Sequence, residues 1–256
     1  MTHYVLILAG GQGTRLNNTK YPKQFLEISN KPMLMHSIQT FKATCPDAKI
    51  YVGIQQKDRL TWGHLCKKYN FNIEHKLYSA GKERFETVFS GLNALVNDFG
   101  LNKAIVSIHD SARPFIDSNL IEDLLEPFEA INVKATIPVI GLKNAILDCS
   151  SGRKTPLNRN NYLACQTPQC FYFEDLFEAY QNTMHQIARE SITGNESKKA
   201  NTLKDKLHDD FTIFSRIESN KKHVKLVDGR KYNIKITTDL DYFLSEKVNE
   251  FVKKIE

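Results

Sequence analysis

The sequence lacks a long hydrophobic run. Its longest apolar stretch, residues 5–9, falls far short of the ~20 residues that a membrane-spanning helix needs. It also lacks the charged segment, apolar core and small-residue cleavage site of a secretory leader. We therefore expect a cytoplasmic protein with no membrane partner.

Cysteine is also scarce. The five cysteines are an odd number and include no Cys-x-x-Cys pair, which argues against a disulfide framework and against a structural zinc site. The spacings assemble no Ser-His-Asp or Cys-His arrangement, and no two histidines are four residues apart, as metal ligands on one helix face are. Zinc and covalent catalysis are not expected, and Cys165 and Cys170 are expected to pack in the interior.

The composition is otherwise that of an ordinary globular protein. The 256 residues are 41% hydrophobic and 25% charged, with a formal net charge of +6. The basic excess suits anionic ligands, but it is spread along the chain and no nucleic-acid-binding signature accompanies it. We expect no nucleic-acid partner and a single domain over 1–256 with an appendage.

Stretches rich in β-branched residues alternate with helix-like patterns. Apolar residues three or four apart predict helices that begin at Pro32 and near Phe85 and Leu120. This alternation predicts an α/β fold, with a mostly parallel twisted sheet and helices on both faces. Functional sites in such folds lie at the carboxyl ends of the strands. The predicted strands are 4–8, 49–54, 104–108, 133–139 and 233–237.

Two segments interrupt the alternation. Residues 139–170 hold short strand-like pieces around a polar stretch, which predicts a hairpin or β-arm, projecting at about 139–165. Residues 189–206 are rich in Ser, Asn and Lys, so a mobile surface insertion is expected there.

The first predicted strand leads into a loop dense in glycine. Gly10, Gly11 and Gly13 would let backbone amides approach a phosphate closely, because glycine has no Cβ. Neither the dinucleotide-binding nor the Walker A pattern is present. Arg15 and Lys23 follow the loop and could offset the charge of a triphosphate. The sequence thus predicts a phosphate-binding loop.

Three other positions are chemically suited to the same edge of the sheet. Asp110 follows a strand of buried type, where a carboxylate can hold Mg²⁺ or contact hydroxyl groups. Residues 81–87 open a helix, whose free N–H groups suit a nucleotide. Lys235 alternates with two isoleucines, so its ammonium group is expected on the opposite face. Arg113 is expected to brace the loop after Asp110 as a structural ion pair.

Residues 8–15 and 22–26 resemble the nucleotide-binding signature of the sugar nucleotidyltransferase superfamily. The Pro-Lys-Gln form at 22–24 narrows the resemblance to the 2-C-methyl-D-erythritol 4-phosphate cytidylyltransferases and their ribitol 5-phosphate relatives. Other matches follow in family order along the chain: Gly81 with Arg84 and Thr87, 108–114, 166–171, Asp209-Asp210 and 233–237.

The resemblance implies a Rossmann-like nucleotidyltransferase fold and a role for each matching residue. Arg15, Lys23, Lys235 and Arg159 are implied as catalytic, and Asp110 as the Mg²⁺ ligand. The acceptor, a polyol phosphate, is expected to bind Asp110, Thr167, Lys235 and Arg159. Arg159 corresponds to a family arginine that reaches the site from the neighbouring subunit's arm, which implies a homodimer with a composite site. CTP is expected to bind Ala9, Gly10, Gly11, Gly13, Thr14, Gly81, Arg84 and Thr87.

The acceptor half departs from the family pattern. An Asp-Thr pair usually follows the Pro-Val of the arm, and Gly141 and Leu142 stand there instead. Three hypotheses are carried forward. The first is transfer of CMP from CTP to 2-C-methyl-D-erythritol 4-phosphate, for isoprenoid precursor synthesis. The second is transfer to D-ribitol 5-phosphate or a similar alditol phosphate, and the third is a non-catalytic nucleotide-binding homologue.

Overall fold

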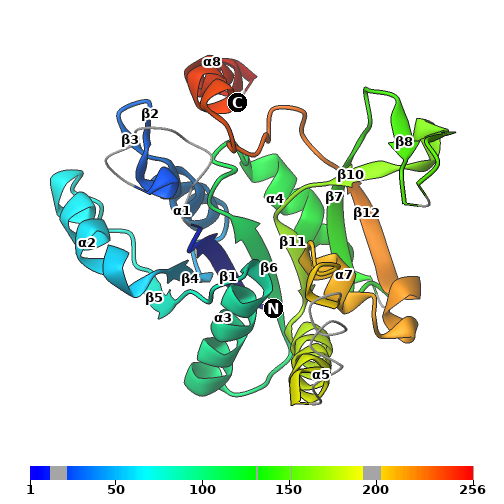
Figure 1. Cartoon of the computed structure of the whole chain (residues 1–256). Coiled ribbons are helices and arrows are strands. Elements are labelled where there is room, and N and C mark those ends of the chain that lie inside the picture. Colours follow the sequence, from blue (N-terminus) through cyan, green and yellow to red (C-terminus); the bar gives the residue numbers. More distant parts are fainter. Residues whose placement is uncertain (12–21, 131, 151, 193–202, 256) are drawn as a thin grey trace.

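The computed structural model describes residues 1–11, 22–130, 132–150, 152–192 and 203–255. Among them, eight strands form one sheet in the order β10-β7-β11-β6-β1-β4-β5, with β12 also paired to β7 (Figure 1). The strands are β1 (Thr2–Ala9), β4 (Lys49–Ile54), β5 (Lys76–Ser79), β6 (Ala104–Asp110), β7 (Ala135–Gly141), β10 (Leu163–Cys165), β11 (Gln169–Tyr172) and β12 (Val224–Asp228).

The centre of the sheet is parallel. Strand β1 pairs in parallel with β4 and β6, and β4 pairs in parallel with β5. Strands β10 and β11 run antiparallel to their neighbours. The carboxyl ends of β1, β4, β5 and β6 therefore meet at one edge, where the sequence predicts the site.

Helices cover both faces of the sheet, as predicted. One face packs against α3 (Arg84–Phe99), α5 (Phe173–Ile192) and α7 (Asp210–Phe214). The other packs against α1 (Met33–Thr44), α2 (Arg59–Lys68) and α4 (Ser118–Leu125). Alternate residues of β1 divide between the two cores, since Leu6 lies in one and Ile7 in the other. Each helix among the described residues is too short or too polar to cross a bilayer.

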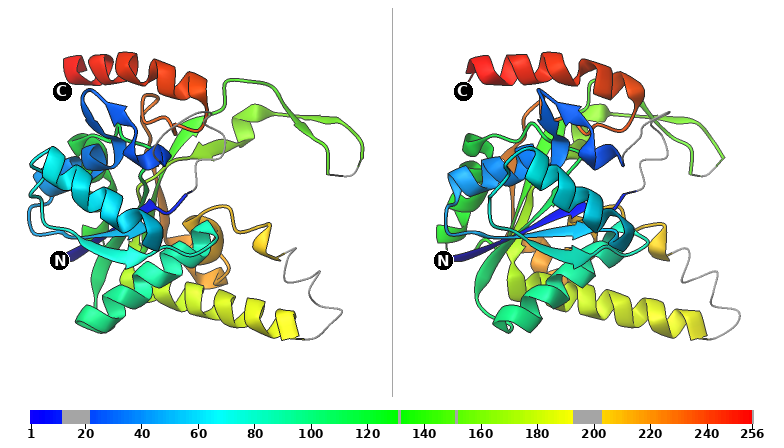
Figure 2. Two further views of the ribbon diagram at one scale, coloured as in Figure 1. Left: turned by 60° about the vertical axis from the view of Figure 1, so that its left-hand side comes forward. Right: turned by 90° about the vertical axis from the view of Figure 1, so that its left-hand side faces the viewer.

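Two features lie outside these layers. The predicted hairpin is formed by β8 (Ile146–Asp148) and β9 (Thr155–Leu157), and it projects away from the sheet (Figure 2). Helix α8 (Asp239–Ile255) lies over a small hairpin of β2 (Glu27–Ile28) and β3 (Lys31–Pro32). Glu246 of α8 accepts a hydrogen bond from the backbone N–H of Ser29 at 2.7 Å.

The predicted strand at 233–237 is wrong. The segment pairs with no described strand, and a backbone hydrogen bond from Ile236 N to Ala112 O (2.8 Å) links it to the loop after β6. Strand β12 instead lies beside β7, and its half-exposed residues gave no period-2 signal. The predicted alternation of side chains holds only in part, because Ile236 is fully buried whereas Ile234 is half-buried like Lys235.

The predicted insertion at 189–206 is also partly wrong. Residues 189–192 continue α5, and Leu203 and Leu207 are buried in the core that α5 and α7 share. Residues 193–202 lie outside the described residues. Cys170 is buried as expected, whereas Cys165 is exposed, because it lies on β10, a short strand at the edge of the sheet.

Candidate active site

A cavity of about 180 Å³ opens at the carboxyl ends of β1 and β6, beside the start of α3. We call it the site cleft. Its walls come from five separate parts of the sequence, which the parallel register of the sheet brings together. The predicted site residues that line it are Gly10, Gly11, Lys23, Gly81, Arg84, Thr87, Asp110 and Lys235.

The glycine loop is held by two glutamine side chains. Gln24, on the 3₁₀ helix η1 (Lys23–Phe25), donates to the carbonyl of Ala9 at 2.8 Å. Gln55 donates to the carbonyls of Gly10 and Gly81, both at 3.1 Å. This ties the loop after β1 to the loop before α3, so that both face the cleft. Gln24 belongs to the Pro-Lys-Gln signal, whereas nothing in the sequence marked Gln55.

Asp110 joins two cations at the floor of the cleft. Its Oδ1 lies 3.1 Å from Arg84 Nε, and its Oδ2 lies 2.7 Å from Lys235 Nζ. Only 10% of the side chain is exposed. Burial by itself would raise the pKa of Asp110, but the charges of Arg84 and Lys235 hold that pKa well below its ordinary range. The carboxylate is therefore ionised at neutral pH.

Arg84 has a second acidic partner, which the sequence analysis did not include among the site residues. Its Nη2 lies 2.7 Å from Oδ2 of Asp210, and the Asp210 side chain is fully buried. Tyr180 donates to the other oxygen of Asp210 at 2.6 Å. Asp210 thus fixes the guanidinium group that faces Asp110. The Asp209-Asp210 motif was a signal for this role.

Lys235 is placed by anchors on Asn233, two residues before it. The carbonyl of Asn233 accepts hydrogen bonds from Arg113 Nη1 (2.8 Å) and Gln166 Nε2 (3.2 Å). Asn233 Nδ2 in turn donates to the carbonyl of Thr167 at 2.9 Å. Arg113 thus connects the loop after Asp110 to this segment through a carbonyl. The ion pair expected of it is wrong, since it makes no salt bridge within the described part of the chain.

The start of α3 is already partly capped by its own side chains. Glu86 accepts hydrogen bonds from the backbone N–H groups of Lys82 (2.9 Å) and Glu83 (3.1 Å). The hydroxyl of Thr87 accepts from Gly81 N at 3.0 Å and donates to the carbonyl of Glu83 at 3.1 Å. Thr87 thus shapes the Gly81 loop, and its contact with a nucleotide stays a prediction.

Three predicted residues that the structure describes are not in the lining of the cleft. Ala9, at the end of β1, is buried in the core on the α1 side of the sheet. Thr167 is buried behind Asp110, where its Oγ1 accepts a hydrogen bond from the Asp110 backbone N–H at 3.1 Å. Arg159 lies beyond β9, in a 3₁₀ helix (Arg159–Asn161), and donates to the carbonyl of Lys143. Gly13, Thr14 and Arg15 lie outside the described residues.

The carboxylates of the cleft set a limit on metal binding. Among the described residues, no three His, Cys, Asp or Glu side chains gather as a metal site. Asp110 and Glu83 are the acidic residues in the lining. One or two carboxylates together with substrate phosphate oxygens are the usual ligands of Mg²⁺, so this donor set fits that ion only when a phosphate-bearing substrate is present.

Comparison with known proteins finds relatives over almost the whole chain. The family model of 2-C-methyl-D-erythritol 4-phosphate cytidylyltransferase matches residues 3–250. The curated enzyme of that name from Azobacteroides pseudotrichonymphae is 32% identical over 245 residues, covering 95% of this chain and 96% of the relative. The enzyme of the same name from Bacteroides fragilis is 32% identical over 241 residues, covering 94% and 96%.

Solved structures show the same fold. The Francisella tularensis enzyme of that name aligns with a TM-score of 0.73 at 25% identity, and the alignment covers 97% of this chain and 100% of that chain. The 4-diphosphocytidyl-2C-methyl-D-erythritol synthase from Anaerococcus prevotii aligns with a TM-score of 0.74 at 22% identity, covering 97% and 96%. Together with the relatives, these matches show that the chain belongs to the 2-C-methyl-D-erythritol 4-phosphate cytidylyltransferase family.

Proposed function

We propose that the protein transfers CMP from CTP to 2-C-methyl-D-erythritol 4-phosphate and releases pyrophosphate. The observation that carries the proposal is the joining of Lys235 and Arg84 through Asp110, in the same cleft as the glycine loop and Lys23. Family membership supports this acceptor over D-ribitol 5-phosphate, and it supports an enzyme over a non-catalytic homologue.

The nucleotide would lie along the glycine loop. A Cβ on Gly10 would lie 2.3 Å from Ala80 Cβ, so the loop is packed on its inner side. A Cβ on Gly11 would lie 3.9 Å from its nearest neighbour, Lys23 Cε, so its outer side is open to a ligand. Backbone N–H groups and the Lys23 ammonium would then meet the triphosphate, and Arg15 would add a further charge.

The acceptor needs no general base. The second pKa of a phosphate monoester is near ~6, so at neutral pH it is largely a dianion and already a nucleophile. One of its oxygens bonds to the α-phosphorus of CTP, the bond from that phosphorus to the bridging oxygen breaks, and pyrophosphate leaves with the electron pair. The protein's task is to align two polyanions and to stabilise the charge that moves onto the leaving group.

Lys235 is the residue best placed to hold the acceptor phosphate. Its Nζ is held by Asp110 at 2.7 Å, and 38% of its side chain is exposed toward the cleft opening. The carboxylate keeps the ammonium in one place before substrate arrives, which lowers the entropy lost on binding.

Mg²⁺ fits the proposal, because Asp110 would be one of its ligands together with phosphate oxygens of the nucleotide. When bound, it would reduce the negative charge that opposes attack on the α-phosphorus. Burial and ionisation of Asp110 suit this role.

We further propose a homodimer in which the hairpin of one subunit brings Arg159 to the cleft of the other. Arg159 follows β9 on the projecting arm, and it is not among the residues that line its own chain's cleft. Exposed apolar side chains at Leu147, Tyr162 and Leu163 lie on the same arm and suit a contact between subunits.

Pyrophosphate release, measured with CTP and each acceptor in turn, tests the proposal. We expect release with 2-C-methyl-D-erythritol 4-phosphate and at least about a hundredfold lower kcat/KM with D-ribitol 5-phosphate, because an acceptor that leaves buried polar groups unpaired is rejected strongly. A preference for ribitol 5-phosphate would contradict the acceptor assignment. No release with either would support the non-catalytic hypothesis.

A further inference from the structure

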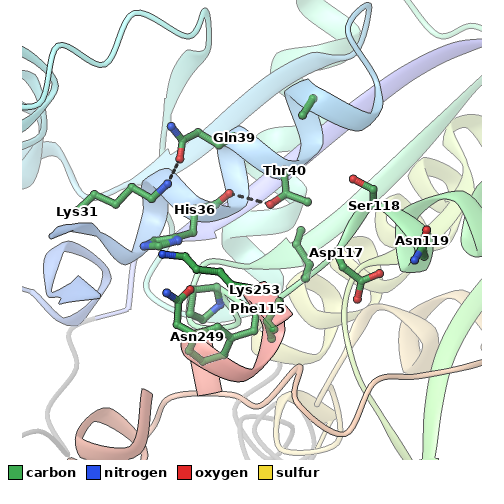
Figure 3. Close-up of a pocket in the computed structure, with 14 residues that line it drawn as sticks. Lys31, His36, Gln39, Thr40, Phe115, Asp117, Ser118, Asn119, Asn249 and Lys253 are labelled. Carbon is green, nitrogen blue, oxygen red and sulfur yellow. Dashed lines mark hydrogen bonds between the residues drawn. The ribbon is translucent and has the colours of Figure 1, made fainter. Parts of the chain in front are cut away.

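A second cavity, of about 520 Å³, lies between α1, α8 and the segment 114–119 (Figure 3). We call it the α1–α8 cavity. It shares no lining residue with the site cleft. Lys31, His36 and Lys253 bring three basic side chains to it, from β3, α1 and α8.

The two lysines are near one another without an acidic partner. Burial and the charge of Lys253 both lower the pKa of Lys31. Lys31 donates its hydrogen bond to the neutral Gln39, and neither lysine forms a salt bridge with any residue that the structure describes. Like charges held together repel, and this repulsion is relieved when an anion binds between them.

His36 adds to the cluster without adding charge at neutral pH. Burial, together with the charges of Lys31 and Lys253, lowers its pKa to about 4. Its Nε2 lies 2.8 Å from the carbonyl of Ile28. The neutral ring therefore forms part of a fixed wall for the cavity.

The acidic residue of the lining, Asp117, is already engaged. Its Oδ1 accepts from Leu120 N at 2.7 Å as the N-cap of α4, and its Oδ2 accepts from the Tyr232 hydroxyl at 2.9 Å. Arg230 Nε lies 3.8 Å away and balances its charge. Asp117 therefore does not neutralise the two lysines.

We propose that the α1–α8 cavity is a second anion site, which binds a phosphate or diphosphate group between Lys31 and Lys253. Ammonium groups bind such anions through charge-assisted hydrogen bonds. Inorganic phosphate and pyrophosphate share this chemistry, and the cavity volume accommodates either.

Two chain segments that line the α1–α8 cavity continue from residues of the site cleft. Lys31 follows Lys23 by eight residues, through η1 and the β2–β3 hairpin. Pro114 and Phe115 in the cavity lining follow Asp110 by four and five residues along the chain. An anion at this site would brace the two segments that carry Lys23 and Asp110.

Backbone amide shifts in nuclear magnetic resonance spectra, recorded during titration with inorganic phosphate, test the proposal. We expect saturable shifts at residues 40, 118 and 119, in the wild type and in Lys235→Ala, which lacks the cation proposed for the acceptor. In the double variant Lys31→Gln/Lys253→Gln the dissociation constant at these amides should rise at least about tenfold. Titration with pyrophosphate identifies the tighter of the two anions.

Lys254→Gln is the matched control, because it removes one charge from an exposed neighbour on α8 that does not line the cavity. Lys253→Gln alone changes an exposed side chain of α8 and serves if the double variant does not fold. Shifts confined to the cleft, or an equal loss of affinity in Lys254→Gln, would overturn the second site.

Discussion

Lys235 Nζ and Asp110 Oδ2 lie 2.7 Å apart, although 125 residues separate them in the sequence. The lysine belongs to a loop with no strand partner, so its position depends on this ion pair and on the anchors at Asn233. The carboxylate is shared with Arg84, which in turn is fixed by Asp210. One acidic side chain thus aligns two cations from distant parts of the chain.

Replacing Lys235 should weaken use of the acceptor more than use of CTP. Loss of one hydrogen bond to a charged group costs about 1.5–3 kcal/mol, so Lys235→Ala should lower kcat/KM for the acceptor by about 10- to 150-fold. Steady-state kinetics with each substrate varied would measure it. Lys231→Ala, at an exposed position of the same segment, is the control. An unchanged KM for the acceptor would remove Lys235 from the phosphate site.

Removal of Arg84 should destabilise the fold, because it leaves the carboxylate of Asp210 buried without its cation. A buried charge that loses its partner typically costs about 3–5 kcal/mol. Urea unfolding of Arg84→Ala would measure this, with Arg216→Ala at an exposed position as the control. Asp210→Asn in the Arg84→Ala background should recover part of the loss, since it removes the unpaired charge. Additive effects of the two substitutions would contradict the pairing.

The two glycines of the loop should respond differently to alanine. Gly10→Ala places a Cβ 2.3 Å from Ala80 Cβ, whereas the Cβ of Gly11→Ala would lie no closer than 3.9 Å to any residue that the structure describes. Overpacking of this kind costs about 1–3 kcal/mol, and here it would separate the loops that face the cleft. We expect Gly10→Ala to lower both the melting temperature and the affinity for CTP, and Gly11→Ala to leave the melting temperature unchanged. Equal melting temperatures would contradict the packing of the loop.

Much of this arrangement follows from the sequence. Buried parallel strands have long runs of β-branched residues, so the prediction of 49–54 coincides with β4, and that of 104–108 falls short of β6 by only two residues. Because parallel strands end at one edge, the placement of Asp110 beside the glycine loop was predictable too. The hairpin at β8 and β9 was evident from its polar turn.

Other features depend on contacts that no local pattern records. Residues 233–237 alternate like a strand, but side-chain hydrogen bonds to Asn233 hold them outside the sheet. Leu203 and Leu207 are isolated apolar residues in a polar stretch, and only their burial against α5 and α7 shows that they belong to the core. Gln55 and Asp210 act through partners that are 26 residues or more away.

The fold should lose stability in mildly acidic solution because several histidines, among them His3, His36 and His109, have a pKa that burial lowers. Burial lowers the pKa of His36 to about 4 and that of His109 to about 3. In the unfolded chain both would bind a proton below about pH 6.5, so the unfolded state gains protons first as the pH falls. Stability is therefore full above that pH and declines below it, by up to about 1.4 kcal/mol per pH unit for each such histidine.

Urea unfolding at pH 7, 6 and 5 would measure this slope. His109→Gln should reduce it by about one proton's worth, or ~1.4 kcal/mol per pH unit, even if it also lowers stability at every pH. His64→Gln, at an exposed position, should leave the slope unchanged. A slope that His109→Gln does not alter would show that other groups govern the acid sensitivity.

The composite site makes a prediction about mixtures of inactive proteins. If Arg159 acts on the partner's cleft, a dimer of one Arg159→Ala subunit and one Lys235→Ala subunit carries one site with both substitutions and one with neither. Equal amounts of the two variants, mixed under exchange, form about half such dimers and should regain about a quarter of wild-type activity. Lys154→Ala, exposed near the tip of the same arm, should be active alone. No regained activity in a mixture shown to exchange subunits would mean that Arg159 serves its own chain or none, because every cleft would then still lack one of the two cations.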